Sequence, residues 1–158
     1  MDLTGLLSNR GFMTYRPYFQ IIAAVDPATV KSTLQNNSGL TILSHMPVKV
    51  NSNGELSLID VAVDGDILNL IGISNQMILT GTSGEVVTQG KVKNITSFNF
   101  GDSIYVSKTG GLTNILPSEG VGGFTSGDWV VKVGTIGKDL NNPLIKDLFI
   151  NIQIIGQL

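Results

Sequence analysis

From residue 47 onward, the sequence consists of short apolar segments separated by turns that contain Gly, Asn or Asp. The last segment shows the pattern most clearly, since Leu148, Ile150, Ile152 and Ile154 alternate with the residues between them. A period of two is that of a β-strand, whereas an amphipathic helix repeats every 3.6 residues. Many short strands with glycine-rich turns are typical of sandwiches and barrels. The sequence therefore predicts an all-β fold, either a small antiparallel β-barrel or a β-sandwich.

Two turns in this region have the composition of hairpins. Residues 51–54 read NSNG between two apolar segments, and Thr109-Gly110-Gly111 occupies the same place later in the chain. The expected strands are 48–50, 56–63, 67–73, 85–89, 91–95, 103–107, 112–115, 129–136 and 148–155.

The first 45 residues differ from the rest and are expected to form an extended N-terminal arm. Asp26-Pro27 resembles a helix N-cap followed by a proline at the first helical position, which predicts a short helix over 27–34. A strand is expected over 18–25. Four aromatic residues are candidates for docking onto a partner, although they could equally fold back onto the core: Phe12, Tyr15, Tyr18 and Phe19. The expected division is an arm over 1–45 and a β-barrel domain over 46–158.

The charged fraction is unusually low. Asp, Glu, Lys and Arg make up 14% of the chain, compared with about 25% in an ordinary soluble domain. Because burying an unpaired charge is costly, a chain with few charges is suited to being covered by neighbouring chains. The alternative is a monomer with a neutral polar surface.

Composition also excludes several kinds of partner. The net charge of −2 with scattered signs gives no basic patch for nucleic acid. There is no cysteine, no apolar run long enough to cross a membrane, and no signal peptide over residues 1–10. We therefore expect the chain to be made in the cytoplasm and to leave it only as part of a larger particle.

A Gly-Asp pair precedes three of the expected strands: Gly65-Asp66, Gly101-Asp102 and Gly127-Asp128. Glycine accepts positive φ before a strand, and the aspartate side chain can accept hydrogen bonds from nearby backbone N–H groups. The first and third strands also end in glycine, at Gly72 and Gly134, where a bulge or the close approach of another backbone is expected.

A longer pattern surrounds the middle pair. Residues 98–113 read FNFGDSIYVSKTGGLT, and residues 129–136 read WVVKVGTI. Together they resemble the β-barrel module of tailed-bacteriophage virion proteins, notably capsid decoration and head-fibre proteins, over about 71–158. The resemblance implies a virion structural protein whose partner is a major capsid or tail protein, and it implies a homo-oligomer, with a trimer favoured. A tail or baseplate component is the alternative within this class.

Candidate chemistry is sparse. His45, the only histidine, has no recognisable catalytic partner and is expected in a loop or an interface. Asp60, Asp64 and Asp66 could hold Ca²⁺, but turn capping explains them without a metal. Residues 120–123 read GVGG and lack the Lys-Ser/Thr of a phosphate-binding loop. We therefore expect no catalytic residue, no metal and no cofactor.

The remaining alternative is a carbohydrate-binding or surface-binding β module that uses Tyr105, Phe124 or Trp129 as a stacking platform. For Trp129, which lies inside an apolar segment, packing in the core is the favoured interpretation.

Overall fold

The computed structural model describes residues 28–158, and the expectations for the strand over 18–25 and for the docking aromatics lie outside this range. The expected all-β fold is confirmed, with one short helix among nine strands in the described part. The elements are β1 Val30–Asn36, β2 Pro47–Val50, β3 Leu56–Leu58, α1 Asp64–Leu68, β4 Leu70–Ser74, β5 Thr82–Val92, β6 Ser103–Val106, β7 Leu112–Thr113, β8 Trp129–Lys138 and β9 Lys146–Gln157.

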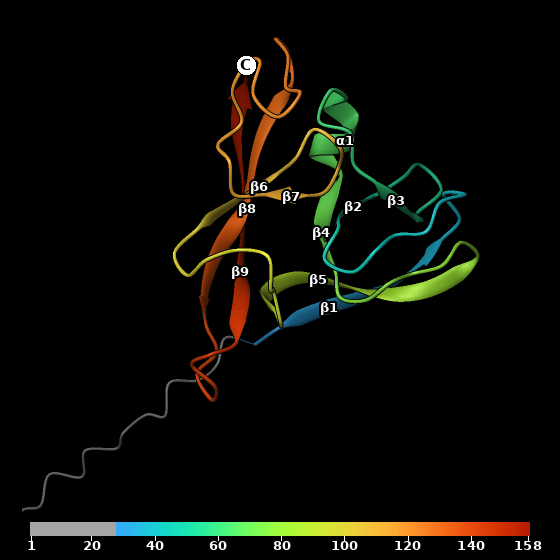
Figure 1. The fold of residues 1–158 in the computed structure, drawn as a ribbon. Coiled ribbons are helices and arrows are strands. Elements are labelled where there is room, and N and C mark those ends of the chain that lie inside the picture. Colours follow the sequence, from blue (N-terminus) through green and yellow to red (C-terminus); the bar gives the residue numbers. More distant parts are fainter. Residues whose placement is uncertain (1–27) are drawn as a thin grey trace, which may run out of the picture.

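Five of these strands close into a small barrel in the order β1-β3-β2-β4-β5 (Figure 1). Antiparallel pairing of β1 with β5, from Val30 opposite Gln89 to Asn36 opposite Thr82, completes the circle. Residues 51–54 connect β2 to β3 as the expected hairpin. The barrel has no open edge where β1 meets β5, so its strands can be short and still have their backbone groups paired.

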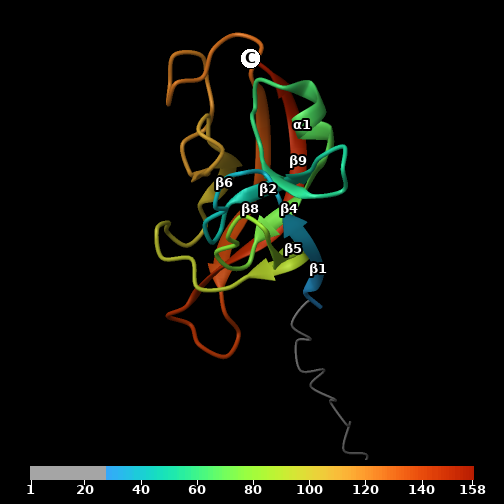
Figure 2. The same ribbon diagram turned by 90° about the vertical axis from the view of Figure 1, so that its right-hand side faces the viewer.

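A second sheet continues from the end of β5, in the order β5-β9-β8-β6-β7. β5 pairs with β1 over most of its length, and its last residues, Gly90 to Val92, pair instead with Ile150 to Leu148 of β9. The two strands expected over 85–89 and 91–95 are therefore one strand, β5. Figure 2 shows α1 beside β9 at the far end of this sheet, where Asp64 accepts hydrogen bonds from the side chains of Trp129 and Gln157.

Two hydrophobic clusters correspond to these two parts. The smaller one fills the barrel with Ile42, Val48, Leu56, Ile78 and Val86. The larger one joins the barrel and α1 to the second sheet, and its buried members include Ile67, Ile73, Val87, Ile104, Val131 and Leu148.

Several local expectations are wrong. The helix expected over 27–34 is excluded in its described part, because residues 30–34 belong to β1 and pair with β5. The folded domain therefore begins before residue 46, and β1 belongs to the barrel and not to an arm. The strand expected over 56–63 ends at Leu58, and Ile67 lies in α1 and not in β4.

Two glycines sit where strands approach each other closely. A Cβ added at Gly72 would lie 2.1 Å from the carbonyl oxygen of Val87, and one added at Gly134 would lie 2.0 Å from that of Phe149. Register shifts occur at both places, between Val48 and Lys49 opposite Gly72, and next to Gly134 in the β8–β9 pairing. The expected bulge and close approach are therefore present at both glycines.

Candidate interaction surface

Two of the three Gly-Asp pairs form the same turn. Asp102 accepts a hydrogen bond from the N–H of Asn99 at 2.9 Å, and Asp128 accepts one from the N–H of Thr125 at 2.8 Å. In both cases the donor lies three residues earlier, and the glycine before the aspartate has a positive φ, 85° and 89° respectively. The Asn99 N–H is the largest cause that lowers the pKa of Asp102. At Asp128 the largest cause is the Lys108 ammonium, which donates to the carboxylate at 2.7 Å, and the Thr125 N–H lowers the pKa further.

Gly65-Asp66 does not form this turn, so the expectation that all three Gly-Asp pairs open a strand in the same way is wrong for it. Gly65 lies inside α1 and does not have positive φ. Asp66 accepts a hydrogen bond from the N–H of Asp60, six residues earlier, and forms an ion pair with Lys49. Its carboxylate thus ties the segment before α1 to β2.

The Gly110-Gly111 pair lies in the tight connection between β6 and β7. Gly110 has φ of 80° and donates its N–H to the carbonyl oxygen of Ser107 at 3.0 Å. The N–H of Gly111 is accepted by the Ser107 hydroxyl at 2.9 Å. All of these contacts position the backbone, and none of them presents a group to a ligand.

The three aspartates considered for calcium each accept hydrogen bonds from different groups of the chain. Asp60 accepts from the N–H of Ala62, Asp64 from Trp129 and Gln157, and Asp66 from Asp60 and Lys49. Over residues 28–158, no group of three or more His, Cys, Asp or Glu side chains could hold a metal ion.

His45 lies in the connection between β1 and β2 with φ of 66°. Its ring is half-buried, and desolvation lowers the pKa of the imidazole below the usual 6.5. Its backbone N–H is accepted by the carbonyl oxygen of Ser74 at 3.0 Å. No hydrogen bond joins its ring to a serine hydroxyl or a carboxylate of the described chain, so the geometry provides no nucleophile–base pair.

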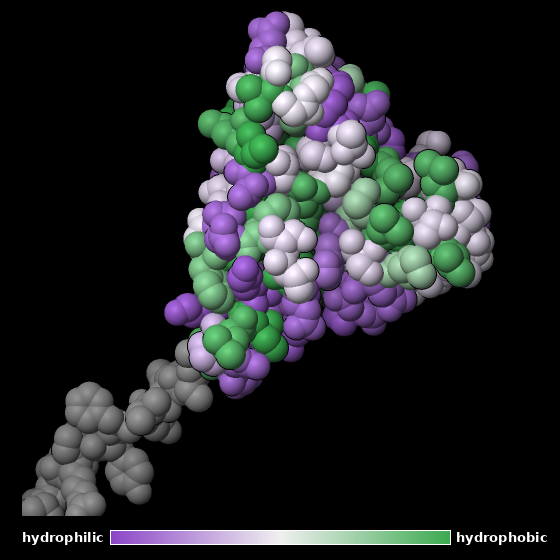
Figure 3. All heavy atoms as spheres, in the orientation of Figure 1, coloured by the Kyte–Doolittle hydropathy of each residue, from purple (hydrophilic) through white to green (hydrophobic). Residues whose placement is uncertain are grey.

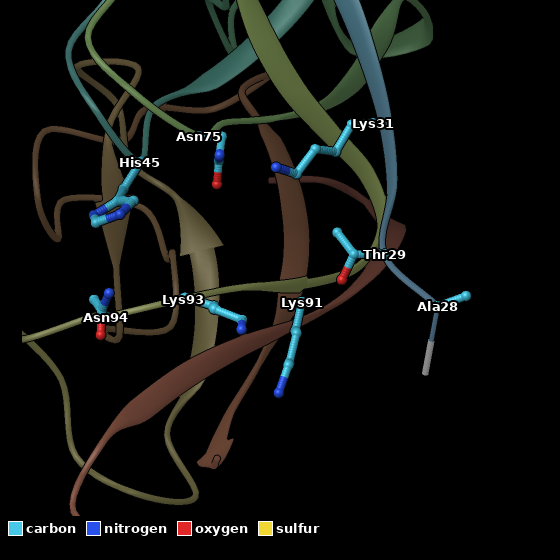
Figure 4. Close-up of a pocket in the computed structure, with 8 residues that line it drawn as sticks. All are labelled: Ala28, Thr29, Lys31, His45, Asn75, Lys91, Lys93 and Asn94. Carbon is cyan, nitrogen blue, oxygen red and sulfur yellow. The ribbon is translucent and has the colours of Figure 1, made fainter. Parts of the chain in front are cut away.

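His45 does line a polar cavity of about 640 Å³ (Figure 4). The cavity is bordered by Ala28, Thr29, Lys31, His45, Asn75, Lys91, Lys93 and Asn94.

Two of its three lysines are engaged elsewhere. Lys31 pairs with Glu85 at 2.8 Å. Figure 4 shows Lys91 directed away from His45 and Asn75, toward Asp139 at 3.0 Å and Asp147 at 3.1 Å. The cavity therefore has less free positive charge than its lining suggests.

The aromatic residues considered for sugar stacking are not arranged as a platform. Phe124 is 3% exposed, and Trp129 packs against the larger cluster while its indole N–H donates to Asp64 at 2.8 Å. Core packing of Trp129 is thus confirmed. Tyr105 is half-buried on β6, which pairs with the strand that carries Trp129.

A different feature of the barrel was not located from the sequence. Ile42, in the β1–β2 connection, and Ile78, in the β4–β5 connection, form an antiparallel bridge. Each residue donates its N–H to the other's carbonyl oxygen, at 3.0 and 2.8 Å. Both isoleucine side chains point into the barrel and are buried. Because successive side chains point to opposite sides, the residues that flank the bridge must point outward.

Three of these four flanking positions, all but Thr41, carry large apolar side chains. Leu43 lies across from Met77, and Leu79 follows Ile78 on the other side of the bridge; together with Leu40 they are 51–59% exposed. We refer to Leu40, Leu43, Met77 and Leu79 as the barrel-end surface. Figure 3 shows hydrophobic side chains among neutral ones on the right-hand part of the molecule, where Figure 1 places the barrel, with hydrophilic residues below them.

Buried polar side chains hold the barrel-end surface in place. The amide of Asn36, which is 0% exposed, donates to the carbonyl oxygens of Leu40 at 2.8 Å and Ile78 at 2.9 Å. The hydroxyl of Ser74, also fully buried, donates to the carbonyl oxygen of Leu43 at 2.7 Å and accepts from the N–H of Met46 at 2.9 Å. These bonds fix the backbone of both segments, so a contact made through this surface would lose little ordering entropy.

Charge is absent from both segments that build this surface. Residues 32–48 and 67–84 contain no Asp, Glu, Lys or Arg. With 22 charged residues in 158, 35 residues of this chain would on average carry about five. Glu55, to which the Asn37 amide donates at 2.7 Å, adds a charge beside these segments. An apolar centre beside polar groups is the organisation of a protein–protein interface.

Comparison with known proteins gives no relative to guide the assignment, because no family model matches the chain and no curated protein or solved structure is significantly similar to it. Among the described residues, no helix is long and apolar enough to cross a membrane.

Proposed function

We propose that this chain is a structural protein of a tailed-bacteriophage virion, which decorates the capsid or forms a head fibre and acts by association and not by catalysis. The barrel-end surface carries the proposal. It exposes four large apolar side chains on a rigid, charge-free support, and a patch of this kind is a typical site of protein association.

The other features of the chain agree with this role. The β-barrel fits the module that the 98–113 and 129–136 patterns resemble. The carboxylates that could have served chemistry are used to cap turns or to pair with lysines. In a symmetric particle each contact is repeated many times, so a modest affinity per copy gives strong overall attachment.

The experiment is mass spectrometry of particles purified from the phage that encodes the chain. We expect the chain in intact particles at many copies, and chemical cross-linking to the major capsid protein. Cross-links to tail or baseplate proteins alone would favour the alternative location. Abundance in the lysate together with absence from purified particles would refute a virion role.

The proposed docking role of Phe12, Tyr15, Tyr18 and Phe19 has a separate test. Deleting residues 1–16 should abolish incorporation into particles while the barrel stays folded, because the paired strands β1–β9 all lie within residues 28–158. Normal incorporation of the shortened chain would remove Phe12 and Tyr15, which lie in the deleted segment, from the proposal.

A further inference from the structure

The barrel-end surface raises the question of what covers it. We propose that it is covered by the barrel-end surface of other copies of this chain, which meet there around a symmetry axis. This inference rests on the proposed function, because it names which partner covers the barrel-end surface.

Charge is the first argument for a second copy. When identical surfaces meet, every charged side chain near the axis faces its own like charge, which is destabilising unless a counter-charge is close. Residues 32–48 and 67–84 avoid this cost entirely, because they have no charged side chain.

The same property argues against a dissimilar partner. Recognition between different proteins commonly uses complementary charges to select the partner and to fix its orientation. The barrel-end surface presents Leu and Met side chains with exposed neutral polar neighbours such as Thr41, Ser44 and Thr80. Glu55, which accepts from the Asn37 amide, is a charge beside its segments and not within them. Interfaces between identical chains are the more apolar class.

Geometry supplies the third argument. The Ile42–Ile78 bridge sets Leu43 and Met77 side by side as an opposed pair whose backbones are close. The buried Asn36 and Ser74 fix both segments before any contact forms. Two or three copies can therefore interlock these side chains without reordering the loops.

The test uses the purified full-length chain alone, with its mass measured by light scattering after size exclusion. We expect a multiple of 16.8 kDa for the wild type. The double variant Leu43→Lys/Leu79→Lys should elute as a monomer with an unchanged melting temperature, because both side chains are exposed.

The matched control is Leu140→Lys/Leu144→Lys, which places the same two charges on exposed leucines of the β8–β9 connection. This control should keep the wild-type mass. A wild-type chain that is monomeric at about 100 μM, or a Leu43→Lys/Leu79→Lys variant that keeps the wild-type mass, would overturn the proposal.

A mixing experiment identifies the partner directly. Leu43→Glu/Leu79→Glu should also be monomeric, but mixing it with Leu43→Lys/Leu79→Lys should restore association to at least a dimer, because a Lys-bearing copy and a Glu-bearing copy then attract each other across the axis. Failure to restore it while particles still contain the wild-type chain would mean that another virion protein covers this surface, so the inference would fail and the proposed function would stand.

Discussion

The close approach at Gly134 gives the sharpest test of the fold. An added Cβ would lie 2.0 Å from the carbonyl oxygen of Phe149 and 3.1 Å from a methyl carbon of Leu148. Because real Cβ atoms essentially never come within 3.0 Å of such an atom, Gly134→Ala requires β8 and β9 to separate by about 1 Å. The obstacle is backbone, so no side-chain rotation relieves it.

The cost follows from the position of the clash. The β8–β9 pairing runs from Trp129 opposite Gln157 to Lys138 opposite Lys146, and it supports the larger cluster. We expect Gly134→Ala to destabilise the fold by at least about 2 kcal/mol, as overpacking does. For a chain of this size that corresponds to a melting temperature lower by roughly 6 °C or more.

The assay is thermal unfolding followed by circular dichroism and by Trp129 fluorescence. Gly65→Ala is the control, since a Cβ there meets nothing within 4 Å and Gly65 lies in α1. It should leave the melting temperature unchanged or raise it slightly, because Ala favours a helix over Gly. A Gly134→Ala protein that melts within 2 °C of wild type would show that β8 and β9 are not this close.

Three further outcomes are expected. Lys91→Met leaves the fully buried Asp147 carboxylate without its cation and should cost about 3–5 kcal/mol in urea unfolding. Asn36→Ala leaves two carbonyl oxygens without their buried donor and should cost about 2 kcal/mol by the same assay. Lysine partners and backbone hydrogen bonds lower the pKa of Asp128 and of Asp139, the latter to about 2. The two carboxylates therefore stabilise the folded state fully above the unfolded pKa near 3.8, and this stabilisation is lost as the pH falls toward 2. The urea midpoint should drop between pH 5 and pH 2, and it should drop less in Asp139→Asn.

The sequence predicts the parts of the fold that depend on neighbouring residues. The NSNG turn and the period-two segments located the β2–β3 hairpin, β8 and β9, because turn geometry and strand alternation are local properties. Local signals failed at β1. Asp26-Pro27 favours a helix start, but residues 30–36 gain pairing with β5, which lies about 50 residues further along the chain.

The candidate interaction surface was predicted only in general terms. The low charged fraction indicated that the chain hides part of its surface, but it could not say where. The Ile42–Ile78 bridge joins segments 36 residues apart, and only that contact turns Leu43 and Met77 into neighbours. A map of the charge-free segments 32–48 and 67–84 was the one sequence signal that could have pointed there.

The sharing of β5 has a mechanical consequence. Its first half closes the barrel against β1, and its last residues pair with β9. No linker therefore separates the two parts, and a hinge motion between them would require the pairing along β5 to change. A load applied at one part is therefore transmitted to the other along the continuous hydrogen-bonded strand β5.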